Sequence, residues 1–97
     1  LANTTGTENV AVGSNALDAN TTANGNSALG HGSLGANTTG AANVAVGTAS
    51  LQSNTTASNN TGVGYLALGA NTTGTQNVAV GALAGDALTT GGSNSVL

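Results

Sequence analysis

The sequence of 97 residues contains no lysine, arginine, cysteine, methionine, proline, tryptophan or phenylalanine. Without basic residues the chain has no positively charged side chains to bind phosphate groups, which argues against nucleic-acid binding and against a basic membrane-surface helix. Without cysteine there is no disulfide framework, no thiolate metal site and no thiol nucleophile. No apolar run approaches the ~20 residues that span a bilayer, so membrane insertion is not expected either.

Large apolar side chains are scarce as well. The hydrophobic fraction is 38%, but nearly half of it is alanine, and the rest is leucine, valine and the single Tyr65. A compact globule of this size normally fills its centre with larger side chains. Disordered chains, however, are usually rich in charge and proline, whereas this chain is 3% charged and has no proline. The composition therefore indicates an ordered chain with an unusual core.

What the sequence does contain is a repeat. Asn-Thr-Thr recurs every 17 residues without a single insertion, and a degenerate copy, Leu-Thr-Thr, follows at the same spacing. We therefore predict one repeat array over residues 1–97, and we expect it to be a segment of a longer fibre. The units begin at residues 3, 20, 37, 54, 71 and 88.

Several positions of the unit, counted from its first residue, hardly vary. The seventh is Asn in all six units, the tenth is Val or Leu, the eleventh is Gly and the fifteenth is usually Leu. The fourth position alternates, because Ala23 and Ala57 stand in the second and fourth units where the first, third and fifth have Gly. Nothing in the sequence requires this alternation.

The unit predicts strands and turns. Gly, Asn and Thr are poor interior helix residues, and no stripe of large apolar groups has helical spacing. Val10-Ala11-Val12 has the alternation of a strand whose two valines share one face, and a second extended segment is expected to end near Leu17. Asn-Thr-Thr-Gly suits a turn. The sequence thus predicts an all-β parallel β-solenoid of about six rungs, each rung being one 17-residue coil.

Stacked rungs place equivalent residues above one another, about 4.8 Å apart. Asn side chains in one column can form a hydrogen-bonded amide ladder that satisfies buried polar groups. The expected ladder consists of Asn9, Asn26, Asn43, Asn60, Asn77 and Asn94. The expected apolar spine consists of Val12, Leu29, Val46, Val63, Val80, Leu97, Leu17, Leu34, Leu51 and Leu68. The expected turn glycines are Gly13, Gly30, Gly47, Gly64 and Gly81.

This core is thin for an isolated chain, because most rungs add only two or three branched aliphatic side chains. Such a chain gains stability by sharing its core with copies of itself, so self-association is expected. Uncapped rungs also expose strand edges, which favours end-to-end stacking.

The Asn-Val-Ala-Val-Gly-x-x-Ala-Leu pattern of residues 9–17, with its Asn-Ser-Ala-Leu-Gly variant at 26–30, resembles the head repeats of YadA-like trimeric autotransporter adhesins. The form with Asn-Thr-Thr-Gly also resembles arrays in phage and virus tail fibres. The resemblance implies a left-handed β-roll in which three chains pack around a threefold axis. It also implies a fibre on a cell or virion surface that touches a host cell or matrix. YadA-like repeats are usually shorter, so Asn-Thr-Thr-Gly would be an added loop or a longer edge.

No catalytic, metal or cofactor site is expected. Asp18 and Asp86 share one position of the unit but lie four rungs apart, too far for paired-carboxylate chemistry, and Glu8 stands alone. His31 has no thiol or carboxylate partner within its unit, so it forms neither a catalytic triad nor a metal site. Tyr65 is interpreted as an interface plug, a neutral surface residue or an exposed contact. The Asn-Thr-Thr sequons can accept N-glycans, but the repeat already explains them as turn and ladder residues.

The sequence therefore predicts a non-catalytic structural and adhesive module of an extracellular or virion surface fibre. Its partners are copies of itself in a homotrimer and an unidentified ligand on a host cell surface or matrix. Two alternatives stay open: a filament subunit that stacks end to end, and an ice-binding repeat protein. The ice-binding alternative ranks lower, because adjacent Thr residues of an extended stretch point to opposite faces.

Overall fold

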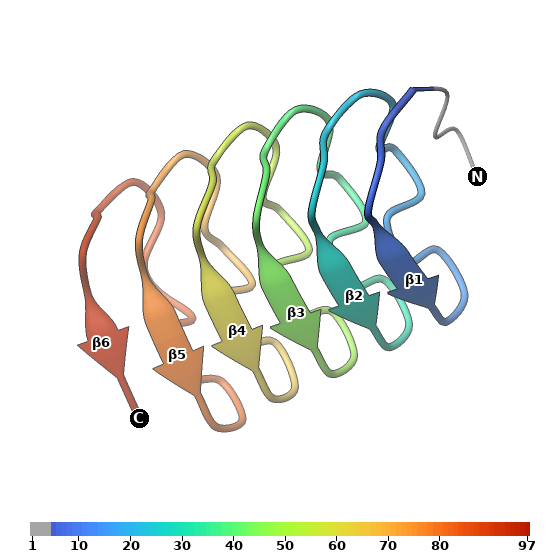
Figure 1. The fold of residues 1–97 in the computed structure, drawn as a ribbon. Helices are drawn as coiled ribbons and strands as arrows, with labels where there is room; N and C mark the ends of the chain where they lie inside the picture. The colour runs from blue at the N-terminus through green and yellow to red at the C-terminus, as the bar shows by residue number, and fades with distance from the viewer. Residues whose placement is uncertain (1–4) are drawn as a thin grey trace.

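The computed structural model describes residues 5–97, which form an all-β parallel solenoid with a 17-residue repeat and about five turns (Figure 1). Asn3, with which the first unit begins, lies outside the described residues. The predicted fold class is thereby confirmed at the level of a parallel β-solenoid. The described residues contain no helix.

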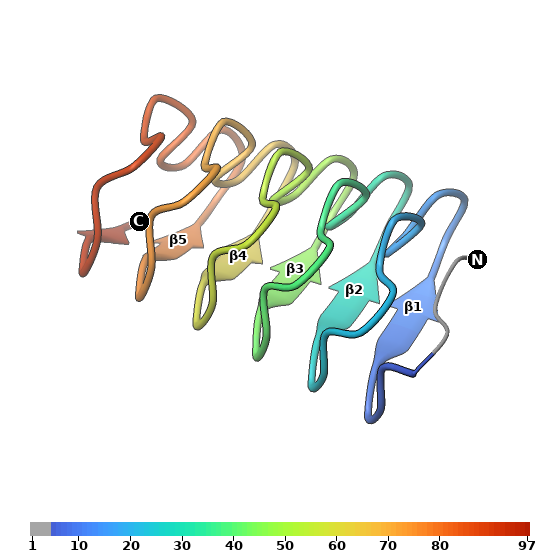
Figure 2. The same cartoon turned by 90° about the horizontal axis from the view of Figure 1, so that it is seen from above.

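Each rung contributes one short strand, and the strands form a single six-stranded parallel sheet in sequence order. Neighbouring strands pair with an offset of one repeat, so that Val10 lies opposite Ser27 and Ala11 opposite Ala28. The view from above in Figure 2 shows each strand on one side of its rung and turn segments closing the others. The strands are β1 (Val10–Val12), β2 (Ser27–Leu29), β3 (Val44–Val46), β4 (Thr61–Val63), β5 (Val78–Val80) and β6 (Ser95–Val96).

The remainder of each rung consists of turns and bends, so the second extended segment expected near Leu17 does not form. Leu17 instead has a φ of 50°, and the sixth, thirteenth and fifteenth positions of the described rungs all have positive φ values between 50° and 72°. This left-handed conformation bends the chain sharply and costs a non-glycine residue about 1–2 kcal/mol. The rung therefore closes through three fixed left-handed bends.

The apolar part of the interior is narrow and lies behind the sheet. It combines the leucines of the fifteenth position with Ala28, Ala45 and Ala79 at the centres of β2, β3 and β5, which are almost fully buried. The turn segments behind the sheet come close to the strand centres. At the strand centre Gly62, for example, an added Cβ would lie 2.8 Å from Ser50 Oγ and 3.5 Å from Leu51 Cγ. The buried cluster consists of Ala16, Leu17, Ala28, Leu34, Ala45, Leu51, Leu68 and Ala79.

Candidate functional site

The polar part of the interior is built on the Asn of the seventh position. The backbone N–H of Asn60 donates to Asn43 Oδ1 at 2.9 Å, and Asn43 Nδ2 donates to the carbonyl of Ala57 at 2.9 Å. Both partners of Asn43 lie in the following rung. The ladder therefore joins side chains mainly to backbone groups, with the amide-to-amide bond from Asn43 to Asn26 longer at 3.2 Å. The four central members, Asn26, Asn43, Asn60 and Asn77, are fully buried, and Asn9 and Asn94 are half-buried.

A second ladder runs through the first residue of each Asn-Thr-Thr. Asn54 Nδ2 donates to Asn37 Oδ1 at 3.0 Å and to the carbonyl of Ala57 in its own rung at 2.9 Å. This column, which the predicted ladder omitted, consists of Asn20, Asn37, Asn54 and Asn71, all at most 1% exposed. Its sequence signal was the invariant spacing of Asn-Thr-Thr. N-glycans cannot be attached to amides that are buried and bonded in this way.

The two ladders converge on the carbonyl of the fourth position, which accepts from both. Gly40 O accepts from Asn26 Nδ2 at 2.8 Å and from Asn37 Nδ2 at 2.9 Å. Within the described residues no buried side-chain nitrogen or oxygen lacks a hydrogen-bond partner. The Asn columns therefore fill the polar part of the core without leaving unsatisfied buried side-chain groups, each of which would cost about 1–3 kcal/mol.

The structure also accounts for the alternation at the fourth position. An added Cβ on Gly40 would collide with the carbonyl oxygen of Ala57 and lie 2.6 Å from Asn37 Oδ1, and Gly74 is equally confined by Gly91. Ala23 and Ala57, in the intervening rungs, are accommodated and buried. Adjacent rungs therefore differ in local backbone path, and the structural period of this corner is two units.

The glycines of the eleventh position, expected at turns, follow directly after the strands. Gly47 has a φ of 125°, and an added Cβ would lie 2.7 Å from the carbonyl carbon and oxygen of Gly64 in the next rung. Positive φ of this size favours glycine. The same close backbone approach joins Gly13 to Gly30, Gly30 to Gly47 and Gly64 to Gly81.

The strands expose an apolar outer face, and this corrects the predicted spine. The tenth-position residues Val12, Leu29, Val46, Val63, Val80 and Leu97 do not line the core: Val12 is 54% exposed, Leu29 50% and Val80 42%, and Val46 and Val63 are half-buried. The fifteenth-position leucines alone occupy the spine. Val-Ala-Val alternation assigns the two valines to one face and the alanine to the other, and it is the alanine that packs against the leucines. We call the outward residues of the eighth and tenth positions the strand face.

The strand face carries no ionisable group. Its members in β1–β5 are Val10, Val12, Ser27, Leu29, Val44, Val46, Thr61, Val63, Val78 and Val80, which repeat in register along the sheet. The eighth position alternates between Val and a hydroxyl residue, but the tenth is aliphatic in every strand from β1 to β5. Isolated exposed aliphatic residues are normal, whereas a contiguous apolar stripe of this length marks an interaction surface. The strand face is therefore the candidate functional site of the molecule.

The Thr pairs have two different environments. The first hydroxyl turns toward the next rung, as when Thr38 Oγ1 donates to the carbonyl of Thr55 at 3.2 Å. The second Thr of each pair is exposed. The repeat thus presents a single exposed Thr column, whereas a flat ice-binding face needs a broader array.

The titratable residues do not form a site. Glu8, Asp18, Asp86, His31 and Tyr65 are all exposed. Within residues 5–97 no three His, Cys, Asp or Glu side chains approach closely enough to hold a metal ion. The same part of the chain has no helix of the length and hydropathy needed to cross a bilayer.

Comparisons with protein-family models, with curated proteins and with solved structures give no significant match to this chain.

Proposed function

We propose that this chain is a structural and adhesive module of a surface fibre in which three copies pack their strand faces against one another. The fibre stands on a cell or virion surface and contacts a host cell or matrix. The resemblance to YadA-like head repeats and to tail-fibre arrays supports this proposal, including a left-handed coil and a threefold axis. The module has no catalytic role.

The exposed apolar strand face is the observation that carries the proposal. In one chain, Val10 is 57% exposed and Val78 39% exposed, although both belong to a regular sheet. Burying such side chains against another sheet removes apolar area from water at about 25 cal/mol per Å². The strand face has no charge to desolvate, so its burial carries no ionic penalty. A second copy offers the same face with the same repeat spacing, and therefore matches it rung by rung.

The solution mass of the protein tests this proposal. Light scattering after size exclusion is expected to give three times the chain mass of 9.0 kDa. The double variant Val44→Lys, Val46→Lys places two charges in the centre of the strand face and is expected to yield monomers that keep the circular dichroism of the parent. Thr39→Lys, at an exposed position outside the strands, is the matched control and is expected to stay trimeric.

Two outcomes would overturn the trimer. If the parent protein is monomeric at micromolar concentration, the strand face does not mediate self-association. If instead the mass rises without limit, and electron microscopy shows filaments of both the parent and the double lysine variant, then the chains assemble by end-to-end stacking.

A further inference from the structure

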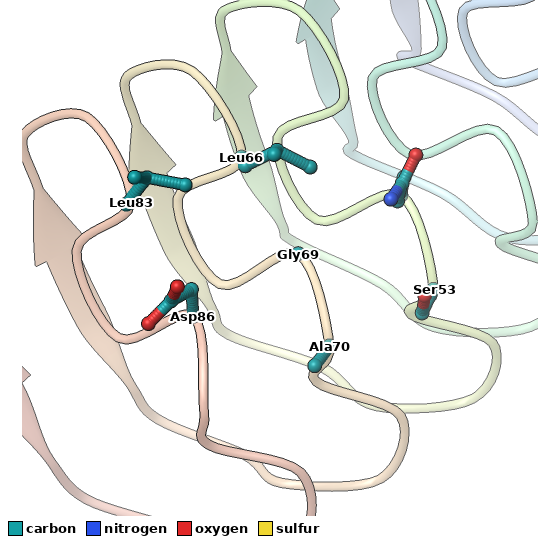
Figure 3. A pocket seen from close by; sticks show the side chains of 7 residues that line it. Ser53, Leu66, Gly69, Ala70, Leu83 and Asp86 are labelled. Carbon is teal, nitrogen blue, oxygen red and sulfur yellow. The ribbon is translucent and has the colours of Figure 1, made fainter.

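A groove of about 300 Å³ crosses three successive rungs on a side of the solenoid away from the strands (Figure 3). Its residues all come from the turn segments that follow β3, β4 and β5. Ser53 lies at one end, Asp86 and Leu83 lie at the other, and Leu66, Gly69 and Ala70 lie between them (Figure 3). Gln52, which precedes Ser53 in the chain, also lines the groove. This volume is at the lower end of the range of small-molecule sites.

What distinguishes the groove from the rest of the repeat is the pair of leucines at the thirteenth position. The sixteenth position reads Gln52, Gly69 and Asp86 in these three rungs, so Gly69 leaves a notch between two polar side chains, as Gly35 does between Asp18 and Gln52 in the first three rungs. The thirteenth position holds Leu66 and Leu83 beside this notch, whereas the first three rungs have Asn15, Gly32 and Ala49 there. The fold alone does not demand these substitutions, because the earlier rungs form the same bend without them.

The polar side chains of the groove are free to bind a ligand. Elsewhere in the repeat, Asn and Ser side chains are used inside the stack, as when Ser50 Oγ donates to the carbonyl of Gly62 at 2.8 Å. Within residues 5–97, the side chains of Gln52, Ser53 and Asp86 make no hydrogen bond or ion pair. The groove therefore offers a carboxylate acceptor, an amide that both donates and accepts, and a hydroxyl, beside the apolar surfaces of Leu66 and Leu83.

We infer that this groove binds an uncharged sugar ring, as the ligand contact of the proposed adhesive module. A sugar presents hydroxyl donors at its edge and C–H groups on its face. The Asp86 carboxylate can accept hydrogen bonds from its hydroxyls, strengthened by charge, and the leucines can pack against its apolar face. Anionic sugars are disfavoured, because the chain has a net charge of −3 and no lysine or arginine.

Nuclear magnetic resonance titration of the whole chain tests the inference. The probes are the methyl glycosides of glucose, galactose, mannose and N-acetylglucosamine, with sialic acid as the anionic control. At least one neutral glycoside is expected to shift the side-chain amide signals of Gln52 and the methyl signals of Leu66 and Leu83, saturably and in the millimolar range. Sialic acid is expected to shift none of them.

Matched variants locate the binding. Asp86→Asn is expected to weaken it by about tenfold, since a charge-assisted acceptor is lost. Asp18→Asn removes the equivalent carboxylate of the first rung, which has no leucine beside it, and is expected to change nothing. Leu83→Asn is expected to abolish the shifts without unfolding, because Asn15 occupies the same left-handed position in the first rung.

The inference is overturned if no neutral glycoside shifts the groove signals, or if Asp86→Asn and Asp18→Asn behave alike. It is also overturned if methylammonium shifts Gln52 and Leu83 while the sugars do not, which would make the groove a cation site. These readings are independent of oligomeric mass. If the protein is a trimer but binds no sugar, only the sugar-binding inference is wrong. If it is a monomer that binds a sugar, only the proposed trimeric assembly is wrong.

Discussion

The backbone N–H of Asn60 donates to the side-chain oxygen of Asn43 at 2.9 Å, one rung below, and both residues are fully buried. This contact repeats at every step from Asn9 to Asn94. It replaces, at the seventh position, the backbone-to-backbone bond that a continuous strand would make. The ladder thus continues the hydrogen bonding of the sheet around the corner of the rung.

Replacing Asn43 by Ala is expected to destabilise the fold by about 1–3 kcal/mol, because the N–H of Asn60 loses its acceptor inside the protein. Urea unfolding followed by circular dichroism measures the loss. Thr56→Ala, at an exposed position, serves as the control and should stay within about 0.5 kcal/mol of the parent. Equal stability of the Asn43 variant and the parent would mean that water reaches the ladder.

Two alanine substitutions at the eleventh position separate backbone strain from contact between rungs. Gly47→Ala meets both a φ of 125° and the carbonyl of Gly64, and should cost about 3 kcal/mol or more. Gly81→Ala has the same strain at φ 128°, but its nearest contact is Ala84 Cβ at 3.8 Å. It should therefore cost only about 1–3 kcal/mol. Similar losses of unfolding free energy in both variants would contradict the close backbone approach.

The alternation at the fourth position predicts unequal losses of stability for substitutions in neighbouring rungs. Gly40→Ala forces a Cβ against the carbonyl of Ala57 and should destabilise the fold by about 1–3 kcal/mol. Ala57→Gly relieves no clash and removes one buried methyl, so a smaller loss of about 1 kcal/mol is expected. Thermal unfolding of the two variants checks the order. A reversed order would show that the rungs share one backbone path.

The left-handed bends offer a way to stabilise the protein. Ala42 is exposed and has a φ of 57°, so Ala42→Gly should relieve strain and raise the unfolding free energy by about 0.5–1 kcal/mol. Ala82 is exposed without positive φ, and Ala82→Gly should lower it by a similar amount. Both values come from the same urea titration, and a loss in both variants would argue against the left-handed bend.

Two leucines of the predicted spine should now behave differently. Leu34 is fully buried, and Leu34→Ala should cost about 2–5 kcal/mol at any protein concentration. Leu29 is 50% exposed on the strand face, so Leu29→Ser should weaken association, and the trimer should dissociate into folded monomers at concentrations at which the parent stays associated. Light scattering and melting curves over a hundredfold range of concentration distinguish the two. Concentration-independent loss in both would place Leu29 in the core of the single chain.

Much of the fold was predictable because the repeat has no insertion. A constant spacing of 17 residues determines that Asn43 stands above Asn26 and below Asn60 in any parallel stack. The identity of the seventh position as a ladder followed from this spacing. The Asn column of Asn-Thr-Thr followed less readily, because Asn next to Thr-Thr is also typical of an exposed turn.

The sequence by itself determined the period, the parallel register and the restriction to small side chains, all of which follow from one invariant repeat length. Only the tertiary structure decided which face of Val-Ala-Val is inside. Alternation pairs Val44 with Val46 but is the same for either orientation of the strand. The left-handed bend at Leu51 turns that leucine inward, where it packs with Ala45 in one buried cluster. The valines therefore face outward, where a single chain leaves them exposed.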